Sequence, residues 1–351
     1  MRRRRSRPDP GEFMAAYSGV IVIGHGPCAT VYGAVETESG RPVALKVFNA
    51  RAEEADPIIR DVRGLARLRP HPNIVVPERI GSTEDGHPVT VSDLQRTSMK
   101  KVIDEDGPAD ARTVTDVGVK IARALAEAHE HGLLHLNLKP QNILVTLMEE
   151  PALADFGLFS FRTSVRSMAD RSPFSAFHAP PEMFEEGELS PATDVYNLAS
   201  TMYQLLSGRA PFEPFGAESA ASIVLRILRD PVTPLSSTAV PYRLTQLVEA
   251  GLAKDPAERP PSASAFADEL RSISAEEGWS AAVPESRRRR GVGRGSPNPS
   301  ETPSEESSGE ELGVPIRRGV PGVSPPGTPD RNVILPEGGR RGSMDRPPRR
   351  S

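Results

Sequence analysis

The sequence is poor in two features that would indicate an extracellular or membrane protein. It has one cysteine, Cys28, among 351 residues, which excludes an internal disulfide and indicates a reducing compartment. No run of apolar residues is long enough to cross a bilayer. The arginines at the start lead into prolines rather than into an apolar segment, so they are not a secretory signal. We therefore expect a cytoplasmic protein with no membrane span.

Charge and composition divide the chain into three parts. Residues 14–275 carry 25 Lys and Arg against 34 Asp and Glu, a net charge of −9, so we expect no specific nucleic-acid partner. Residues 1–13 are rich in Arg and Pro and carry a net charge of +3. Residues 276–351, rich in Pro, Arg, Ser and Glu, carry +2 and have too little apolar content to offset the entropy of ordering. Both ends are predicted to be disordered, and translation can start at Met1 or at Met14.

The first motif is a glycine turn that follows a predicted strand at residues 20–23. Gly24 and Gly26 are followed by Ala29, where a third glycine would complete the spacing, and by Val31. Glycines in such a turn let backbone N–H groups approach phosphates. By itself the turn is more often ordinary, but a second predicted strand, 43–47, follows it and contains Ala44 and Lys46.

The second motif is the stretch His-Leu-Asn-Leu-Lys-Pro-Gln-Asn at residues 135–142, followed by Asp-Phe-Gly at 155–157. In this order of motifs the chain resembles a protein kinase, most closely the bacterial serine/threonine type. The resemblance covers about residues 17–274. It implies an α+β, bilobal fold, with a small β-rich N-lobe at about 14–94 and a large helical C-lobe at about 95–275.

Later segments extend the resemblance. Apolar residues at helical spacing predict a helix over 111–131, and residues 190–199 match the long central helix of the large lobe. In the family, the Asp of that helix, here Asp194, bonds the backbone of the catalytic loop. Glu182 of Pro-Pro-Glu would form a structural ion pair with Arg259.

The resemblance also implies ATP and Mg²⁺ or Mn²⁺ as cofactors, with a protein substrate or signalling partner. Lys46 would hold the α- and β-phosphates and Lys139 would neutralise the transferred group, while Asn142 and Asp155 would bind the metal. Asp61 stands where the family has the Glu that pairs with the lysine. Glu53 and Glu54 are alternatives, but they precede Pro57, a residue favoured at helix starts. The residues expected around the nucleotide are Gly24, Gly26, Val31, Ala44, Lys46 and Asp61.

Two residues depart from the family pattern His-Arg-Asp at the start of the catalytic loop. Asn137 occupies the position of the Asp that accepts the substrate proton, and an amide cannot accept that proton near neutral pH. Leu136 replaces the Arg that binds a phosphorylated activation-loop residue. We therefore expect a serine/threonine kinase with weakened phosphotransfer. The alternative is an inert pseudokinase that acts as a nucleotide-binding scaffold or regulator.

Overall fold

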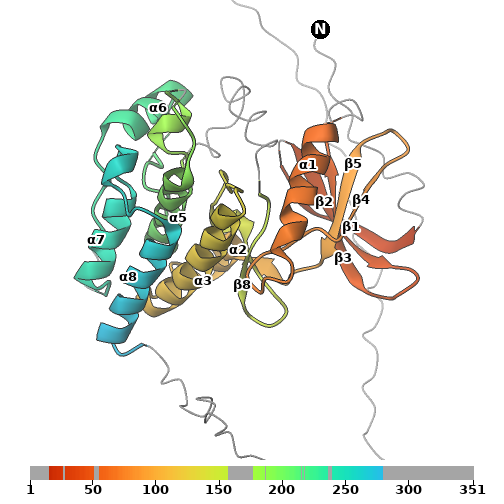
Figure 1. Ribbon diagram of the computed structural model, residues 1–351, viewed down its shortest axis with the longest axis horizontal. Coiled ribbons are helices and arrows are strands. Elements are labelled where there is room, and N and C mark those ends of the chain that lie inside the picture. Colours follow the sequence, from red (N-terminus) through yellow and green to blue (C-terminus); the bar gives the residue numbers. More distant parts are fainter. Residues whose placement is uncertain are drawn as a thin grey trace, which may run out of the picture. The chain divides into compact units, whose positions relative to one another are not determined.

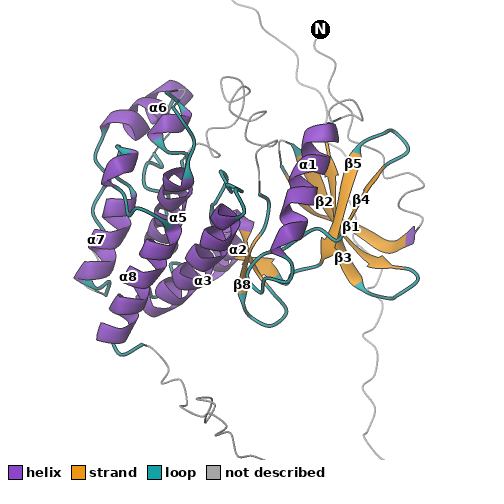
Figure 2. Ribbon diagram, viewed as in Figure 1, coloured by secondary structure: helices purple, strands orange, loops and turns teal. Residues whose placement is uncertain are grey.

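The computed structural model describes residues 16–279 except 27, 51–54, 157–176, 186, 215, 217 and 236–238. Contacts divide the chain into Met1–Arg287 and Arg288–Ser351, and all described residues belong to the first unit. The predicted disorder of residues 1–13 lies outside the described residues, as does that of 276–351 beyond residue 279; Glu53 and Glu54 also lie outside them. Within the described part, a β-rich N-lobe and a helical C-lobe form the predicted α+β architecture (Figures 1 and 2).

The N-lobe contains a five-stranded antiparallel sheet with the order β1-β2-β3-β5-β4. Its strands are β1 (Tyr17–His25), β2 (Ala29–Glu36), β3 (Pro42–Phe48), β4 (Arg79–Ser82) and β5 (Pro88–Asp93). Alternation along β3 assigns its faces: Val43 and Leu45 are fully buried in an apolar cluster, whereas Ala44 and Lys46 point to the opposite face. The predicted strands at 20–23 and 43–47 are confirmed.

Helix α1 (Ala55–Leu65) packs beside this sheet and continues as the 3₁₀ turn η3 (Ala66–Leu68) (Figure 1). Ile58 is buried in a cluster with Ala29 and Phe48, so the apolar stripe of the helix anchors it to β2 and β3. Asp61 lies three residues after Ile58, and with the helix anchored in this way it faces the space between the lobes.

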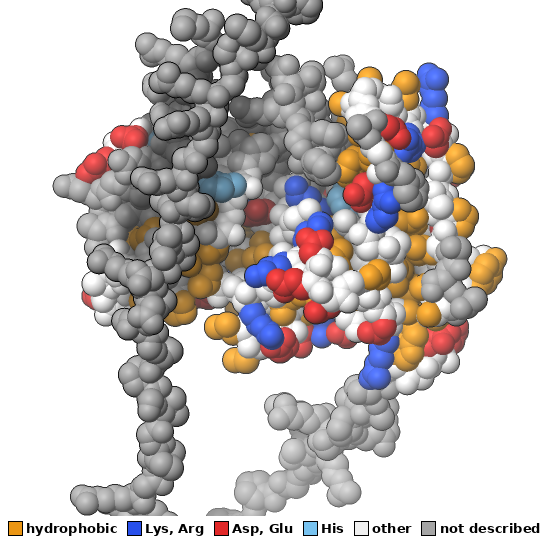
Figure 3. Space-filling view, turned by 180° about the vertical axis from the view of Figure 1, so that it is seen from behind, with side chains coloured by type: hydrophobic (Ala, Val, Ile, Leu, Met, Phe, Trp, Pro, Cys, Tyr) orange, Lys and Arg blue, Asp and Glu red, His pale blue; other side chains and the backbone are white. Residues whose placement is uncertain are grey.

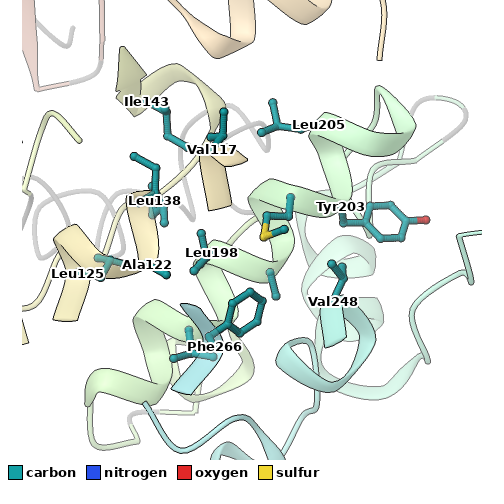
Figure 4. Packing of buried hydrophobic residues seen from close by; sticks show 14 of the residues in the cluster. Val117, Ala122, Leu125, Leu138, Ile143, Leu198, Tyr203, Leu205, Val248 and Phe266 are labelled. Carbon is teal, nitrogen blue, oxygen red and sulfur yellow. The ribbon is translucent and has the colours of Figure 1, made fainter. Parts of the chain in front are cut away.

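The C-lobe is built around helix α5 (Pro191–Ser207), which is buried along most of its length. The other helices are α2 (Met99–Asp106), α3 (Ala111–Glu130), α6 (Ala220–Arg229), α7 (Tyr242–Gly251) and α8 (Ala263–Glu276), with short 3₁₀ turns η4 (Pro140–Asn142), η6 (Pro181–Met183) and η7 (Pro256–Glu258). Side chains from α3, α5, α7 and α8 point toward one another in one core (Figure 4). A Cβ at Gly118 of α3 would lie 2.8 Å from Leu270 and 2.9 Å from Met202, so glycine permits this close helix packing.

A small sheet brings the two predicted loops to the N-lobe. Its strands are β6 (Thr97–Ser98), β7 (Ile143–Val145) and β8 (Pro151–Leu153). Leu153 N–H donates to Asn73 O at 2.8 Å, and Val75 N–H donates to Leu153 O at 2.7 Å. Because β8 is held in this way, Asp155 emerges beneath the N-lobe sheet. Over the described residues, no helix has the length and apolar content needed to span a membrane.

Candidate functional site

A cavity of about 620 Å³ lies between the sheet and the helical lobe and is lined by residues of both. Its wall includes six of the predicted site residues: Gly24, Val31, Ala44, Lys46, Asp61 and Asp155. These residues come from β1, β2, β3, α1 and the segment after β8, so the fold brings together positions more than 130 residues apart. The other four, Gly26, Asn137, Lys139 and Asn142, belong to the turn and loop that adjoin lining residues in the sequence.

The glycine turn is closed by its own backbone, since Gly26 N–H donates to Ala29 O at 2.8 Å. Neither Gly24 nor Gly26 has a positive φ. A Cβ added at Gly24 would lie 3.7 Å from Val31 Cβ, and one at Gly26 would lie 3.6 Å from Ala29 O, both ordinary contacts. The packing of the fold therefore does not require glycine at these two positions. The space left free of side chains suits a ligand that approaches the backbone.

Lys46 and Asp155 form an ion pair in the cavity wall, with Nζ 2.8 Å from Oδ1. Burial would raise the pKa of Asp155, but Lys46, with smaller contributions from His135 and Lys139, outweighs burial and leaves that pKa below its usual value. The carboxylate is therefore ionised at neutral pH. Asp155 also has a positive φ of 63°, an uncommon conformation for a residue with a side chain, and such conformations concentrate at functional sites.

Asp61 lies on the face of α1 that lines the same cavity. The ion pair between Lys46 and Asp61, implied by the resemblance, stays a prediction, because the partner that the structure gives Lys46 is Asp155. The helical placement of Asp61 agrees with the choice of this residue over Glu53 and Glu54. Helix α1 starts at Ala55, so Pro57 is in its first turn as predicted.

The catalytic-loop backbone is held from below by Asp194 of α5. Its carboxylate accepts hydrogen bonds from His135 N–H and Leu136 N–H, both at 2.7 Å, and its Oδ2 also lies 2.9 Å from His129 Nε2. Asp194 is fully buried, so these bonds satisfy a charge that would otherwise be costly. The predicted bond between Asp194 and the loop backbone is confirmed. Its pairing with His129 was not foreseen, because no local motif links the two residues.

His135 fixes the next part of the loop. Its Nδ1 accepts from Asn137 N–H at 3.3 Å, which leaves Nε2 to donate to Ala154 O at 3.0 Å. Burial lowers the pKa of His135, so the ring is neutral and this tautomer is consistent with both bonds. The imidazole therefore ties residue 137 to the strand that leads to Asp155.

Asn142 and Asn137 are linked directly. The amide Nδ2 of Asn142 donates to the backbone carbonyl of Asn137 at 2.7 Å. This bond orients the Asn142 amide so that Oδ1 remains available as an oxygen ligand. Asn142 is buried, and η4 holds it in place two residues before the cavity-lining Leu144.

Lys139 is half-buried between these loops. Burial lowers the pKa of Lys139, Asp155 opposes that shift, and the nearby charge of Lys46 adds to it. The two lysines therefore repel each other across a site that contains the Asp155 carboxylate. Such an arrangement favours a polyanionic ligand between them.

Leu136 is only 2% exposed and packs with Ala179 and Met183. These two residues flank the Pro-Pro-Glu segment, so an apolar contact joins the catalytic loop to the chain that follows residue 176. Leu136 has a positive φ of 57°. The sequence showed the loss of arginine but not this packing, which depends on two residues more than 40 positions away.

The cavity also has an apolar end, for which the sequence predicted Val31 and Ala44 but not the other residues. Ile23 and Ala44 line it from the N-lobe and Leu144 lines it from the C-lobe, while Leu94 and Gln95 form part of its wall. Leu144 could have been found, because it lies two residues after Asn142, the last residue of the catalytic-loop motif. Leu94 and Gln95 belong to the segment between the lobes and carry no motif of their own.

A cavity with an apolar end, a glycine turn and a lysine–carboxylate pair defines a class of proteins that bind nucleotides through base and phosphates. Residues 17–270 match the family model described as protein kinase domain. The chain belongs to the protein kinase family.

Curated relatives agree with the bacterial serine/threonine type. The serine/threonine-protein kinase PknK of Mycobacterium bovis is 34% identical over 279 residues, which is 77% of this chain and 25% of PknK. PknL of Mycobacterium tuberculosis is 32% identical over 269 residues, 72% of this chain and 64% of PknL. PrkC of Bacillus subtilis is 29% identical, with 69% and 38% covered. The chain thus spans about a quarter of the length of PknK.

A solved structure supports the fold alone. Rad53 1–466 in complex with AMP-PNP superposes with a TM-score of 0.62 at 22% identity, covering 73% of this chain and 65% of that one. The predicted bilobal kinase fold is confirmed.

Proposed function

We propose that this protein binds ATP together with a divalent metal ion and transfers the γ-phosphate to serine or threonine of a protein at a rate lowered by Asn137. The observation that carries this proposal is the Lys46–Asp155 pair, 2.8 Å apart in the wall of the cavity, with the glycine turn at the same cavity. Family membership supports the reaction type.

The cavity suits a nucleotide in size and in polarity. Its volume of about 620 Å³ lies within the common range for small-molecule sites. Ile23, Ala44 and Leu144 would contact the flat faces of a base. The backbone at Gly24 and Gly26 and the ammonium of Lys46 would face the phosphates.

The residues present also fit a divalent metal ion. Asp155 supplies an ionised carboxylate and Asn142 an amide oxygen, and hard cations such as Mg²⁺ and Mn²⁺ prefer oxygen ligands. The choice between the two ions is part of the proposal. When bound, the ion would neutralise negative charge on the phosphates.

The remaining groups would position the substrate hydroxyl and neutralise charge on the transferred phosphoryl group. Lys139 would face the phosphoryl group in transfer, where its positive charge would neutralise the phosphate oxygens. Asn137 can accept a hydrogen bond from a substrate hydroxyl through its side-chain oxygen, but it cannot accept the proton. Loss of a general base typically costs roughly 10²–10⁴-fold in rate. We expect a loss at or below the low end of that range, about 10- to 100-fold, because phosphoryl transfer has a loose transition state.

A second function, a pseudokinase that binds nucleotide and presents its shape to a partner, is favoured by one feature of the catalytic loop. Both Leu136 and Asn137 lack the charges of the family pattern, and Leu136 is committed to an apolar contact instead. The protein substrate or signalling partner would differ between the two functions, whereas the nucleotide site would be the same.

The decisive experiment measures phosphotransfer from radiolabelled ATP to a serine/threonine peptide, with magnesium and with manganese, beside the variant Asn137→Asp. We expect the variant to be faster by about 10- to 100-fold, because a general base is restored. Its ATP affinity should change little, since residue 137 would face the acceptor hydroxyl. Asp155→Ala combined with Asn137→Asp serves as the inactive control.

Equal rates for parent and variant on the peptide would show that Asn137 is no lesion. A silent Asn137→Asp variant that still binds ATP would establish the scaffold function. Nucleotide binding itself is measured by the rise in melting temperature with ATP concentration. A rise that persists in Lys46→Ala and Asp155→Ala would remove the proposed site.

A further inference from the structure

The segment between the lobes forms one wall of the apolar end of the cavity, and its backbone groups are partly committed. Leu94 N–H donates to Pro42 O at 3.4 Å, and Arg96 N–H donates to Val145 O at 3.0 Å. These bonds fix the segment to β3 and β7. Outside the sheet ladders of the described residues, Gln95 N–H has no acceptor, and the side-chain Nε2 of Gln95 donates to Asp93 O at 3.1 Å. Gln95 N–H and Asp93 O are therefore the backbone groups available to a bound base.

The side chain of Gln95 is itself part of this wall. Its Nε2 lies 3.1 Å from Asp93 O, and a carbonyl requires a donor, so the NH₂ end of the amide faces the carbonyl. An amide NH₂ carries two hydrogens and only one is used in this bond. The amide therefore has a second N–H beside the carbonyl that a base would meet.

The two common purine nucleotides differ in what they present to such a wall. Adenine carries a 6-amino group, a donor, next to the acceptor N1. Guanine carries a 6-oxo group, an acceptor, next to the donor N1–H. A wall made of a backbone carbonyl and a backbone N–H pairs with adenine. With guanine it places two carbonyl oxygens against each other and the backbone N–H against N1–H. Polar groups that face each other without a partner in this way weaken binding.

We propose that Gln95 is a specificity-determining residue that lets this site accept GTP as well as ATP. The free N–H of the Gln95 amide supplies the donor that the 6-oxo group requires, beside the Asp93 carbonyl that pairs with a 6-amino group. The backbone wall alone would select adenine, and the side chain relaxes that selection. The inference rests on the proposed nucleotide binding and adds to it the class of base.

The test measures dissociation constants for Mg-ATP and Mg-GTP by titration calorimetry on the full chain. We expect the two constants to differ by no more than about tenfold. Gln95→Ala should weaken GTP by about tenfold, the loss of one hydrogen bond, and should leave ATP within about threefold. Gln95→Glu keeps the shape but has only acceptors near the base, so it should penalise GTP at least as strongly.

Gln141 provides a matched control, because it is a glutamine that lines the same cavity from the C-lobe. Gln141→Ala should leave the ratio of the two constants unchanged, whatever it does to both. Binding of ATP without GTP, or an equal loss of both nucleotides in Gln95→Ala, would overturn the role of Gln95 and leave the proposed function intact. Absence of binding by either nucleotide would overturn both.

Discussion

At the scale of single residues, the two departures from the kinase pattern act by different means. Asn137 changes the chemistry at the acceptor hydroxyl while its backbone keeps its bonds to His135 and Asn142. Leu136 changes the packing: where the family pattern has a charged arginine, this chain has an apolar side chain buried against Ala179 and Met183. The loop geometry is therefore preserved although two of its functional groups are gone.

Restoring arginine at position 136 should harm the protein. Leu136→Arg would bury a guanidinium in an apolar cluster, and we expect it to destabilise the fold by about 3 kcal/mol or more. Leu136→Met, which conserves volume, should cost less than about 1.5 kcal/mol. Urea unfolding followed by circular dichroism gives both values. An arginine variant as stable as the methionine variant would show that the cluster opens to admit the charge.

At the scale of elements, helix α5 connects the catalytic loop to the chain that follows the undescribed stretch 157–176. Asp194 holds the loop, while Ser200 and Gln204 hold the ring of His178 through Nδ1 at 2.8 Å and Nε2 at 2.9 Å. Asn197 Nδ2 donates to His178 O at 2.6 Å. One face of one helix thus sets the relative positions of both segments.

His178 should make the protein sensitive to acid. Burial, together with the nearby charge of Lys139, lowers the pKa of His178 from 6.5 to about 3 in the folded state. Below pH 6.5 the unfolded chain binds a proton that the folded chain excludes, so the free energy of unfolding decreases as the pH falls toward 3. The contribution of the neutral, buried His178 to the free energy of unfolding is fully present above pH 6.5. Between pH 6.5 and about pH 3 this contribution decreases by about 1.4 kcal/mol for each unit that the pH falls.

The measurement compares unfolding free energies between pH 7 and pH 4 for the parent and for His178→Gln. The variant should be less stable at pH 7 by roughly 1–2 kcal/mol, since its hydrogen bonds are altered. Its slope against pH should be shallower. His131→Gln, at a ring that lies near the surface, is the control. A slope unchanged in His178→Gln would show that other groups carry the acid sensitivity.

At the scale of the whole molecule, the kinase unit is closed by buried contacts and covered by mixed charge. Glu182 and Arg259 form a buried bidentate pair, with distances of 2.7 and 2.8 Å, as the resemblance implied. On the face shown in Figure 3, basic and acidic side chains intermingle rather than separate by sign. The core ends later than the predicted boundary near residue 275, because Trp279 still packs against the main apolar cluster.

Trp279 should therefore contribute to the stability of the C-lobe. Trp279 N–H donates to Ser274 O at 2.8 Å, which folds the chain back over the end of α8. Trp279→Ala should lower the free energy of unfolding by about 1–3 kcal/mol, less than for a fully buried tryptophan because the ring is only partly buried. Tyr242→Ala, at a largely exposed ring, is the control and should cost less than about 0.5 kcal/mol. Equal losses of stability in the two variants would show that Trp279 is not part of the core.

The sequence by itself determined the family and the fold class, and it predicted the strands at 20–23 and 43–47, the helices at 111–131 and 190–199, and ten candidate site residues. Each of those depends on local information: apolar residues with a period of 3.6 mark α3, and motifs with fixed spacings mark β3, Lys46, Asn142 and Asp155. Residues 137 and 136 were recognised as departures for the same reason, since a motif defines which residue is expected at each position.

Only the tertiary structure decided which partners these residues have. The ion pair of Lys46 with Asp155, the burial of Leu136 beneath Ala179 and the bond from Gln95 to Asp93 depend on how the two lobes and their connecting segment pack. Side-chain pairing is set by distances of a few ångströms in three dimensions. Spacing along the chain does not give the distance between segments that are a hundred residues apart, such as those of Lys46 and Asp155. It also does not give the hydrogen-bond partner of a side-chain amide that can rotate, such as that of Gln95.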